Sequence, residues 1–242
     1  MKNPITLQTI KNNESIRVLI DRANKNLECL GYTEHGLRHV GYVSKTTANI
    51  LKMLGYDDRM VELGAITGWI HDIGNAINRN NHGITGATLA FEILNTMGMD
   101  MSEIALIIGA IGNHEEQNGT PVNPISAALI IADKSDAHRS RVRKKNYNID
   151  KDIHDRVNMS ITKNYLAVDN EKKLIRLVIF MDNKMSSFME YLEIYLSRMV
   201  LSEKAAIFLG YNFELVINNT VINNQKSLAR YEKGNEKEVS ED

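Results

Sequence analysis

Side chains of the types that bind metal ions recur along the first 133 residues of this 242-residue chain. In chain order, the candidate ligands are His39, His71, Asp72, His82, His114 and Asp133. Five of the seven histidines lie between positions 35 and 114, so they are clustered rather than scattered. A single histidine in a helix is more often structural, but the order and spacing together favour a metal site. Imidazole with carboxylate favours iron, manganese, cobalt, nickel or zinc over calcium.

The segments that carry these residues show helical periodicity. Apolar residues recur at helical spacing in five stretches, which predict helices at 33–54, 58–73, 83–97, 101–112 and from 124 towards 143. Asp100 with Glu103 predicts a capping box, and Asn123 with Pro124 predicts an N-cap and a first-turn proline. The pair His71 and Asp72 is expected in the last turn of the second helix. The first 155 residues are therefore expected to be all-helical, with ligands mounted on several helices of a bundle.

The pattern changes after residue 160. Residues 172–180 and 211–222 are rich in β-branched residues and predict strands, while 186–209 repeats at helical spacing. We expect a mainly α protein: a helical metal-binding domain at 1–160, a small α+β domain at 161–224, and a disordered charged tail at 225–242. The methionines between 181 and 199 predict core or dimer packing.

Four local stretches strengthen the metal hypothesis. They read H-G-L-R-H-V (35–40), L-G-A-I-T-G-W-I-H-D-I-G-N (63–75), N-H-E-E-Q-N-G-T-P (113–121) and I-I-A-D-K-S-D-A (130–137). As an ordered set they resemble the HD superfamily of metal-dependent phosphohydrolases. The resemblance implies an HD-type helical bundle in which His39, His71, Asp72 and Asp133 hold one divalent transition-metal ion. It also implies that His82 and His114 hold a second ion, with Asp72 as the bridging and catalytic residue.

Such a centre implies hydrolysis of a phosphomonoester or phosphodiester. Two ions about 3.5 to 4 Å apart activate a hydroxide and stabilise an in-line displacement on phosphorus. The expected substrate is a small phosphorylated molecule, with a nucleotide as the first expectation. A non-catalytic module that senses a nucleotide or metal is the alternative, and a partner-binding adaptor that uses the C-terminal unit is a third reading.

Within the superfamily, residues 35–143 most resemble the HD-GYP-like branch, whose members hydrolyse cyclic di-GMP. Asn113 stands where that branch has the first of two histidines, and Thr120 replaces the tyrosine of its G-Y-P motif. The interval from Asp72 to His82 is also short for that branch, so its substrate does not carry over. The branch that hydrolyses guanosine tetraphosphate places an acidic pair after the H-D pair, and residues 73–76 are I-G-N-A here.

Four further residues are candidates around this centre. His35, one helical turn before His39, and Glu115 are each additional metal ligands, residues that orient ligands, or residues that face solvent. Lys134 and Arg141 are seven residues apart, which predicts that they share a helix face and bind substrate phosphate. A solvated helix end is the alternative for this basic run, and His138 and His154 are interpreted as surface histidines.

Composition limits the other function classes. The formal net charge is −1, which argues against bulk nucleic-acid binding or attraction to an anionic membrane. Cys29 is the single cysteine, so an internal disulfide and a cysteine metal site are excluded. With no signal-like or membrane-spanning stretch expected, the location predicted is cytoplasmic. A sheet this small must have exposed edge strands, which leads to the hypothesis that they pair with a second subunit in a homodimer.

Overall fold

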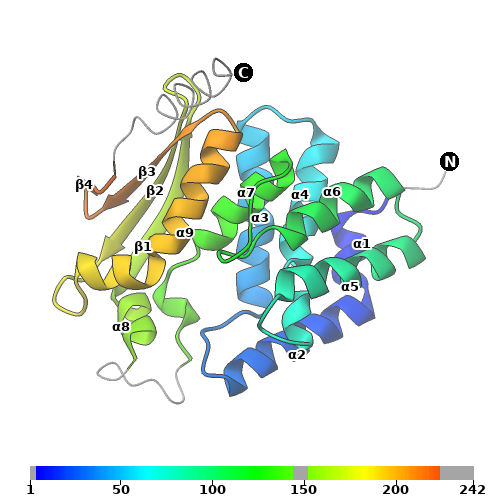
Figure 1. Cartoon of the computed structure of the whole chain (residues 1–242), viewed down its shortest axis with the longest axis horizontal. Coiled ribbons are helices and arrows are strands. Elements are labelled where there is room, and N and C mark those ends of the chain that lie inside the picture. The colour runs from blue at the N-terminus through cyan, green and yellow to red at the C-terminus, as the bar shows by residue number, and fades with distance from the viewer. Residues whose placement is uncertain (1–3, 144–151, 224–242) are drawn as a thin grey trace, which may run out of the picture.

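The computed structural model describes residues 4–143 and 152–223, and helices dominate this part of the chain (Figure 1). Over these residues the elements are, in order, α1 (Leu7–Asn12), α2 (Glu14–Cys29), α3 (Leu37–Met53), α4 (Asp58–Ile70), the 3-10 turn η1 (Ile73–Ala76), α5 (His82–Thr96), α6 (Met101–Gly112), α7 (Pro124–Lys134), the 3-10 turn η2 (Arg139–Arg141), α8 (Ile153–Ser160), β1 (Ile161–Asp169), β2 (Leu174–Met181), α9 (Phe188–Phe208), β3 (Asn212–Ile217) and β4 (Thr220–Val221). The mainly α character, with a small sheet near the C-terminal end, is confirmed.

Capping residues set several of the helix starts. The side chain of Asn123 accepts a hydrogen bond from the Ser126 N–H, and the Ser126 hydroxyl reciprocates at the cap, so α7 begins as predicted. The capping box predicted at α6 is only half formed. Asp100 accepts from the Ser102 N–H, but Glu103 turns away to Arg59 on α4, with both pairs of atoms 2.6 Å apart. A salt bridge between helices has replaced the local bond.

Two helix boundaries differ from prediction in ways that matter for the site. Helix α3 begins at Leu37 rather than residue 33, because Gly36 is extended, and His35 therefore lies in the preceding loop.

Helix α7 ends at Lys134 instead of continuing towards 143, and the chain turns into η2. The Ser135 carbonyl at this turn accepts a hydrogen bond from Asn164 on β1, 2.5 Å away. His71 caps α4, so His71 and Asp72 follow its last turn rather than lying within it.

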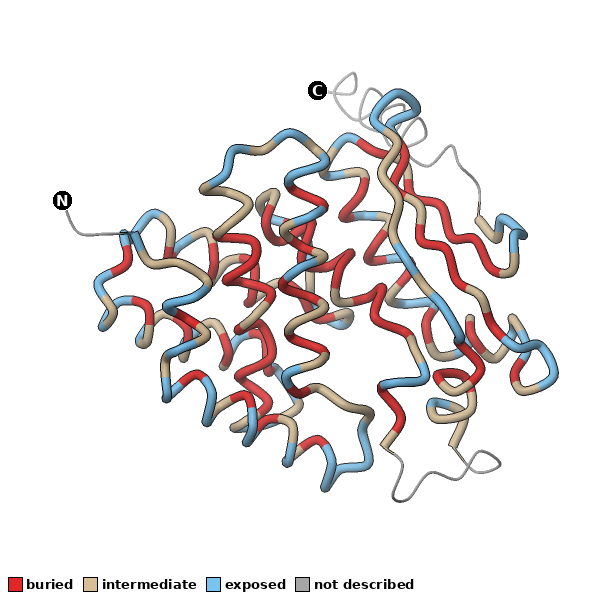
Figure 2. Tube along the Cα trace, turned by 180° about the vertical axis from the view of Figure 1, so that it is seen from behind, coloured by how far each residue is buried: buried red, intermediate tan, exposed pale blue. Residues whose placement is uncertain are grey.

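Helices α3, α4 and α7 form the centre of the bundle. Gly68 on α4 lies against the backbone of α3, where an added Cβ would be 2.7 Å from backbone atoms of Ser44. In α7, residues 125–132 are 0 to 1% exposed, which makes it the most enclosed helix. Figure 2 shows the buried stretches of the trace gathered where these helices meet. Three of the elements that carry site residues are thus fixed by tight packing.

The sheet has the order β1-β2-β3-β4. Strands β1 and β2 are antiparallel, β2 and β3 are parallel through the crossover helix α9, and β3 and β4 form a hairpin. The stretch 211–222, predicted as one strand, is interrupted because Asn218 and Asn219 adopt positive φ angles of 48° and 66° in the hairpin turn. Strand β1 was not predicted.

Helix α9 joins the sheet to the bundle. It packs against β3 on one side and against α7 on the other, so one hydrophobic cluster runs through both parts of the fold (Figure 1). The proposed division at residue 160 remains a prediction, and the predicted tail at 225–242 lies outside the described residues. No helix within residues 4–143 and 152–223 has the length and apolar character needed to cross a bilayer.

Candidate metal centre

The six candidate ligands converge in the interior from separate elements. His39 comes from α3, His71 and Asp72 from the end of α4, His82 from the start of α5, His114 from just beyond α6, and Asp133 from α7. The four imidazoles and Asp72 are at most 4% exposed, and the Asp133 side chain is 13% exposed. Three overlapping groups of these residues place their ligand atoms within 4.8 Å of one another. Residues 94 positions apart in the sequence thus share one site.

Three buried atoms on one side of the centre have no hydrogen-bond partner among the described residues. They are Nε2 of His39, Nε2 of His71 and Oδ2 of Asp72. The two nitrogens lie 3.6 and 3.5 Å from that oxygen, and 3.3 and 3.7 Å from Oδ1 of Asp133. Leaving a buried polar atom unsatisfied costs about 1–3 kcal/mol. A cation bound between these atoms would satisfy all of them.

On the other side of the centre, two nearly perpendicular imidazoles bring their Nε2 atoms together. Nε2 of His82 lies 3.1 Å from Nε2 of His114. Each Nδ1–H donates to a main-chain carbonyl, of Arg79 at 3.0 Å and of Ile111 at 2.6 Å, so both Nε2 atoms carry lone pairs. Oδ1 of Asp72 lies 3.3 and 3.8 Å from the same two nitrogens. Two lone pairs and a carboxylate oxygen repel one another unless a cation lies between them.

Asp72 links the two groups because its oxygens point in different directions. Oδ2 faces His39 and His71, while Oδ1 faces His82 and His114. Burial alone would raise the pKa of Asp72, but the electrostatic influence of the surrounding imidazoles, His71 first and then His114 and His82, holds it well below its usual range. The carboxylate is therefore ionised, as a bridging ligand must be.

Hydrogen bonds behind the first pair of imidazoles fix their orientation. Nδ1–H of His71 donates to the Gly68 carbonyl at 3.0 Å, and Nδ1 of His39 lies 2.6 Å from Oδ2 of Asp136. All four histidines therefore present Nε2 to the interior. Ligating histidines are usually oriented by such a bond on the opposite nitrogen.

Asp136 was not identified from the sequence. It is 2% exposed, and it also binds the Arg38 guanidinium with two hydrogen bonds, of 2.5 and 3.2 Å. Burial raises the pKa of Asp136, but Arg141 and His39 outweigh burial and hold it well below its usual range. Its position three residues after Asp133 was visible in the sequence, but its pairing with His39, 97 positions away, depends on tertiary structure.

His35 and Glu115 have partners that favour an orienting role. Nδ1–H of His35 donates to the Thr33 carbonyl at 2.7 Å, and its Nε2 accepts from Arg141 at 2.9 Å, so its lone pair is used. Burial and then the charge of Arg141 hold the pKa of His35 well below its usual value. Oε1 of Glu115 accepts the Gly83 N–H and lies 3.0 Å from Nδ1 of His82, behind the imidazole rather than in the centre.

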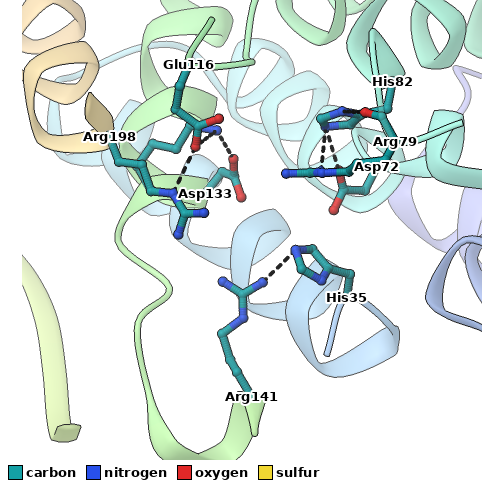
Figure 3. Close-up of a pocket in the computed structure, with 9 residues that line it drawn as sticks. His35, Asp72, Arg79, His82, Glu116, Asp133, Arg141 and Arg198 are labelled. Atoms are coloured by element: carbon teal, nitrogen blue, oxygen red, sulfur yellow. Dashed lines mark hydrogen bonds and ion pairs between the residues drawn. The ribbon is translucent and has the colours of Figure 1, made fainter. Parts of the chain in front are cut away.

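A pocket opens over the centre and is rich in cations (Figure 3). Its lining consists of His35, Asp72, Arg79, His82, Glu116, Asp133, Lys134, Arg141 and Arg198. Lys134 and Arg141 both reach it, although they do not share a helix face, since Arg141 lies in η2. Arg79, Glu116 and Arg198 were missed, because no local spacing marks residues that meet only through tertiary packing.

The pocket cations differ in how far they are neutralised. Nζ of Lys134 lies 2.6 Å from Asp133 and 3.2 Å from Glu116, and Nε of Arg198 lies 3.0 Å from Glu116. Burial raises the pKa of Glu116, but Lys134 and Arg198 outweigh it and lower that pKa to about 2. Arg79 forms no ion pair within the described part of the chain; its guanidinium contacts Asn75, His82 and the ring of Tyr32. Arg79 therefore has charge available for an anion.

Asn113 does not act as a seventh member of this set. Its side-chain amide donates to the Gly109 carbonyl at 3.0 Å, along α6. The histidine that the HD-GYP-like branch has at this place is therefore not replaced by an equivalent contact.

No family model matches the chain, but comparisons with known proteins find similarities that include a curated sequence and a solved structure. An uncharacterized protein of Methanocaldococcus jannaschii is 27% identical over 186 residues, which cover 66% of this chain and 69% of that protein. The crystal structure of a predicted HD superfamily hydrolase from an uncultured Thermotogales bacterium is 25% identical with a TM-score of 0.41, and the match covers 51% of this chain and 67% of that one.

Proposed function

We propose that this chain is a metal-dependent phosphohydrolase that cleaves a phosphomonoester or phosphodiester, with nucleotides as the first substrates to test. The supporting observation is the set of inward-facing Nε2 atoms around one ionised, two-sided carboxylate. His39, His71, Asp72 and Asp133 would hold one divalent transition-metal ion, and His82, His114 and Asp72 a second. Iron, manganese, cobalt, nickel and zinc all suit this donor set.

The donor chemistry fits such ions. Each imidazole turns Nε2 into the centre and is held by a hydrogen bond on Nδ1, and the lowered pKa values of Asp72 and Asp133 keep both carboxylates ionised. For Asp133, burial raises the pKa, but the charge of Lys134 and the neighbouring imidazoles of His39 and His71 outweigh burial and hold it well below its usual range. When bound, ions of this kind supply Lewis acidity and lower the pKa of water towards neutrality.

The chain's own cations would hold the phosphate. Arg79, Lys134, Arg141 and Arg198 line the pocket above the proposed ligands, on the side open to a substrate. Guanidinium and ammonium groups bind phosphate oxygens through charge-assisted hydrogen bonds and offset the charge that develops in the transition state. Asp72 is the residue on which both proposed ion sites depend, so we assign it the central catalytic role.

Hydrolysis of an aryl phosphate and its diester tests this function. Protein loaded separately with manganese, iron, cobalt, nickel or zinc is expected to release the phenol, and the Asp72→Ala variant is expected to be inactive. Asp58→Ala is the matched control, because Asp58 is an exposed aspartate in the first turn of α4.

The screen then extends to nucleotides and cyclic dinucleotides, which covers the activity of the HD-GYP-like branch. A metal-replete protein that is inert on every ester would contradict the proposal and favour the sensing module.

A further inference from the structure

A second cavity adjoins the pocket over the metal centre. It measures about 130 Å³ and lies between the loop before α3 and the helices α8 and α9. Four residues line both spaces, namely His35, Arg79, Arg141 and Arg198. Figure 3 shows these side chains arranged around Asp72 and Asp133, with Arg198 beside Asp133, Arg79 beside Asp72, and His35 and Arg141 below them. A molecule whose phosphate lies among the guanidinium groups therefore has the second cavity next to it.

The wall of this cavity that the first pocket does not share is polar but carries less positive charge. It includes the Asp152 carboxylate and the amide of Asn158, neither of which lines the first pocket. The Asp152 carboxylate already caps α8 by accepting the His154 N–H at 2.8 Å, and one of its oxygens lies 3.4 Å from Nδ1 of His154. A carboxylate has about four acceptor positions, so it can also accept from sugar hydroxyls.

Asn158 is 2% exposed and adds both a donor and an acceptor. Its amide nitrogen donates to the His154 carbonyl at 2.8 Å, and its amide oxygen accepts from the Tyr195 hydroxyl at 3.1 Å. A primary amide has two N–H donors and two acceptor lone pairs, so one of each is left for a ligand.

The size of the cavity limits the occupant. A cavity of roughly 150 Å³ holds one benzene ring, so 130 Å³ suits a single ring and is too small for a dinucleotide. The Tyr32 ring flanks the opening, 5.2 Å from the Arg79 guanidinium. Positive charge gathers at the shared residues and falls off towards Asp152 and Asn158, which suits a phosphate joined to a neutral hydroxylated ring.

We propose that this second cavity binds the sugar ring of a phosphate monoester, so that helices α8 and α9 determine specificity for the hydrolysis carried out at the adjacent centre. This inference rests on the proposed function, because it names the class of substrate that the adjacent metal centre would hydrolyse. Sugar phosphates and nucleoside monophosphates share the required chemistry. In a nucleotide, the base would extend beyond the cavity.

Calorimetric titration of manganese-loaded protein with phosphonates tests the subsite without turnover. In these probes a methylene group replaces the ester oxygen. Methylphosphonate has no ring, and the phosphonate analogues of ribose 5-phosphate and of uridine 5′-monophosphate carry the sugar alone or the sugar with a base. Both sugar-bearing probes are expected to bind at least tenfold more tightly than methylphosphonate. A further gain in affinity for the uridine analogue would identify a nucleotide, rather than a sugar phosphate, as the preferred ligand.

Two variants examine the cavity itself. Tyr32→Ala removes an exposed wall, and His154→Trp fills the space from the exposed start of α8. Each is expected to reduce the advantage of the sugar-bearing probes at least fivefold. His154→Trp is expected to leave methylphosphonate binding unchanged, whereas Tyr32→Ala also removes the ring against Arg79 and is expected to change the binding of all three probes by an additional common factor. Tyr165→Ala is the control, because Tyr165 is 41% exposed on β1, close to the 43% of Tyr32.

Equal binding of the sugar-bearing probes and methylphosphonate to the wild-type protein would overturn the inference. An equal loss for all three probes in both cavity variants would also overturn it. If aryl esters were not hydrolysed but binding still selected the sugar, the proposed function would fail while the subsite would stand.

Discussion

The Nδ1 atom of His39 lies 2.6 Å from a carboxylate oxygen of Asp136, and the Nε2 atom of the same ring faces the candidate metal centre. Asp136 in turn binds Arg38, and its main-chain carbonyl accepts a hydrogen bond from Arg141 at 2.7 Å. One buried residue thus connects the orientation of a proposed metal ligand with a cation of the pocket over the centre.

Replacing Asp136 with asparagine tests this connection. Asp136→Asn keeps the shape but removes the charge behind His39, so affinity for the first metal ion is expected to fall by about 10- to 100-fold. Titration calorimetry with manganese measures the change, and Asp58→Asn is the exposed control. Unaltered affinity in a folded Asp136→Asn protein would show that His39 does not depend on this bond.

The two proposed ion sites are expected to respond differently to loss of their ligands. His82→Ala or His114→Ala removes nitrogen from one side only, so about one ion per chain is expected to remain. Asp72→Ala removes the shared carboxylate and is expected to lower the occupancy of both sites. Elemental analysis after gel filtration gives the stoichiometry. His138→Ala is the control, since His138 lies outside the six-residue set, and equal losses in all three site variants would contradict two separate sites.

A single methyl group added between α3 and α4 is predicted to destabilise the protein. In Gly68→Ala the new Cβ would meet the Ser44 backbone at 2.7 Å, and the helices that carry His39 and His71 would have to separate. We expect a loss of about 1–3 kcal/mol in the free energy of unfolding, as for other overpacked cores. Chemical denaturation measures this loss.

Gly109→Ala is the matched control, because its Cβ would have only ordinary contacts at 3.6 and 3.8 Å. It is expected to be neutral or to stabilise α6 by about 0.5–1 kcal/mol. Similar effects of the two substitutions would contradict the close approach of α3 and α4.

Acid is predicted to weaken the junction between α8 and α9. The Ser187 N–H and the Arg156 guanidinium lower the pKa of Glu190 from 4.5 to about 2. Because the folded pKa is the lower one, this contribution is complete above about pH 4.5 and is lost as the pH falls towards 2.

The difference in unfolding free energy between wild type and Glu190→Gln is therefore expected to shrink as the pH falls through that window. Glu193→Gln, an exposed change on the same helix, is the control. A difference that stays constant from pH 6 to pH 3 would contradict the assigned role of Glu190.

Much of the helical part could be predicted because its signals are local. Apolar periodicity and caps gave α6 its full range and α7 its start, and the order of the histidines gave the candidate ligand set. Strand β1 was missed because only Ile161 of its nine residues is buried, so it lacks a strong alternating pattern. The end of α7 was missed because the turn after it is held by long-range contacts of Asp136 and Asn164.

The same distinction applies within the site. His35 was placed one turn before His39 on a helix, but Gly36 ends the helix between them, and its ring is instead held by Thr33 and Arg141. Arg79 and Arg198 approach the centre from segments more than 100 residues apart. Only the tertiary structure brings these two residues together, so their spacing in the sequence could not predict the contact.

Anomalous X-ray scattering from crystals grown with manganese tests the central claim most directly. The account predicts two anomalous peaks, one between His39, His71, Asp72 and Asp133, and one between His82, His114 and Asp72. A map with no peak at these six side chains, although manganese was present throughout, would contradict the assignment of this site as a metal centre.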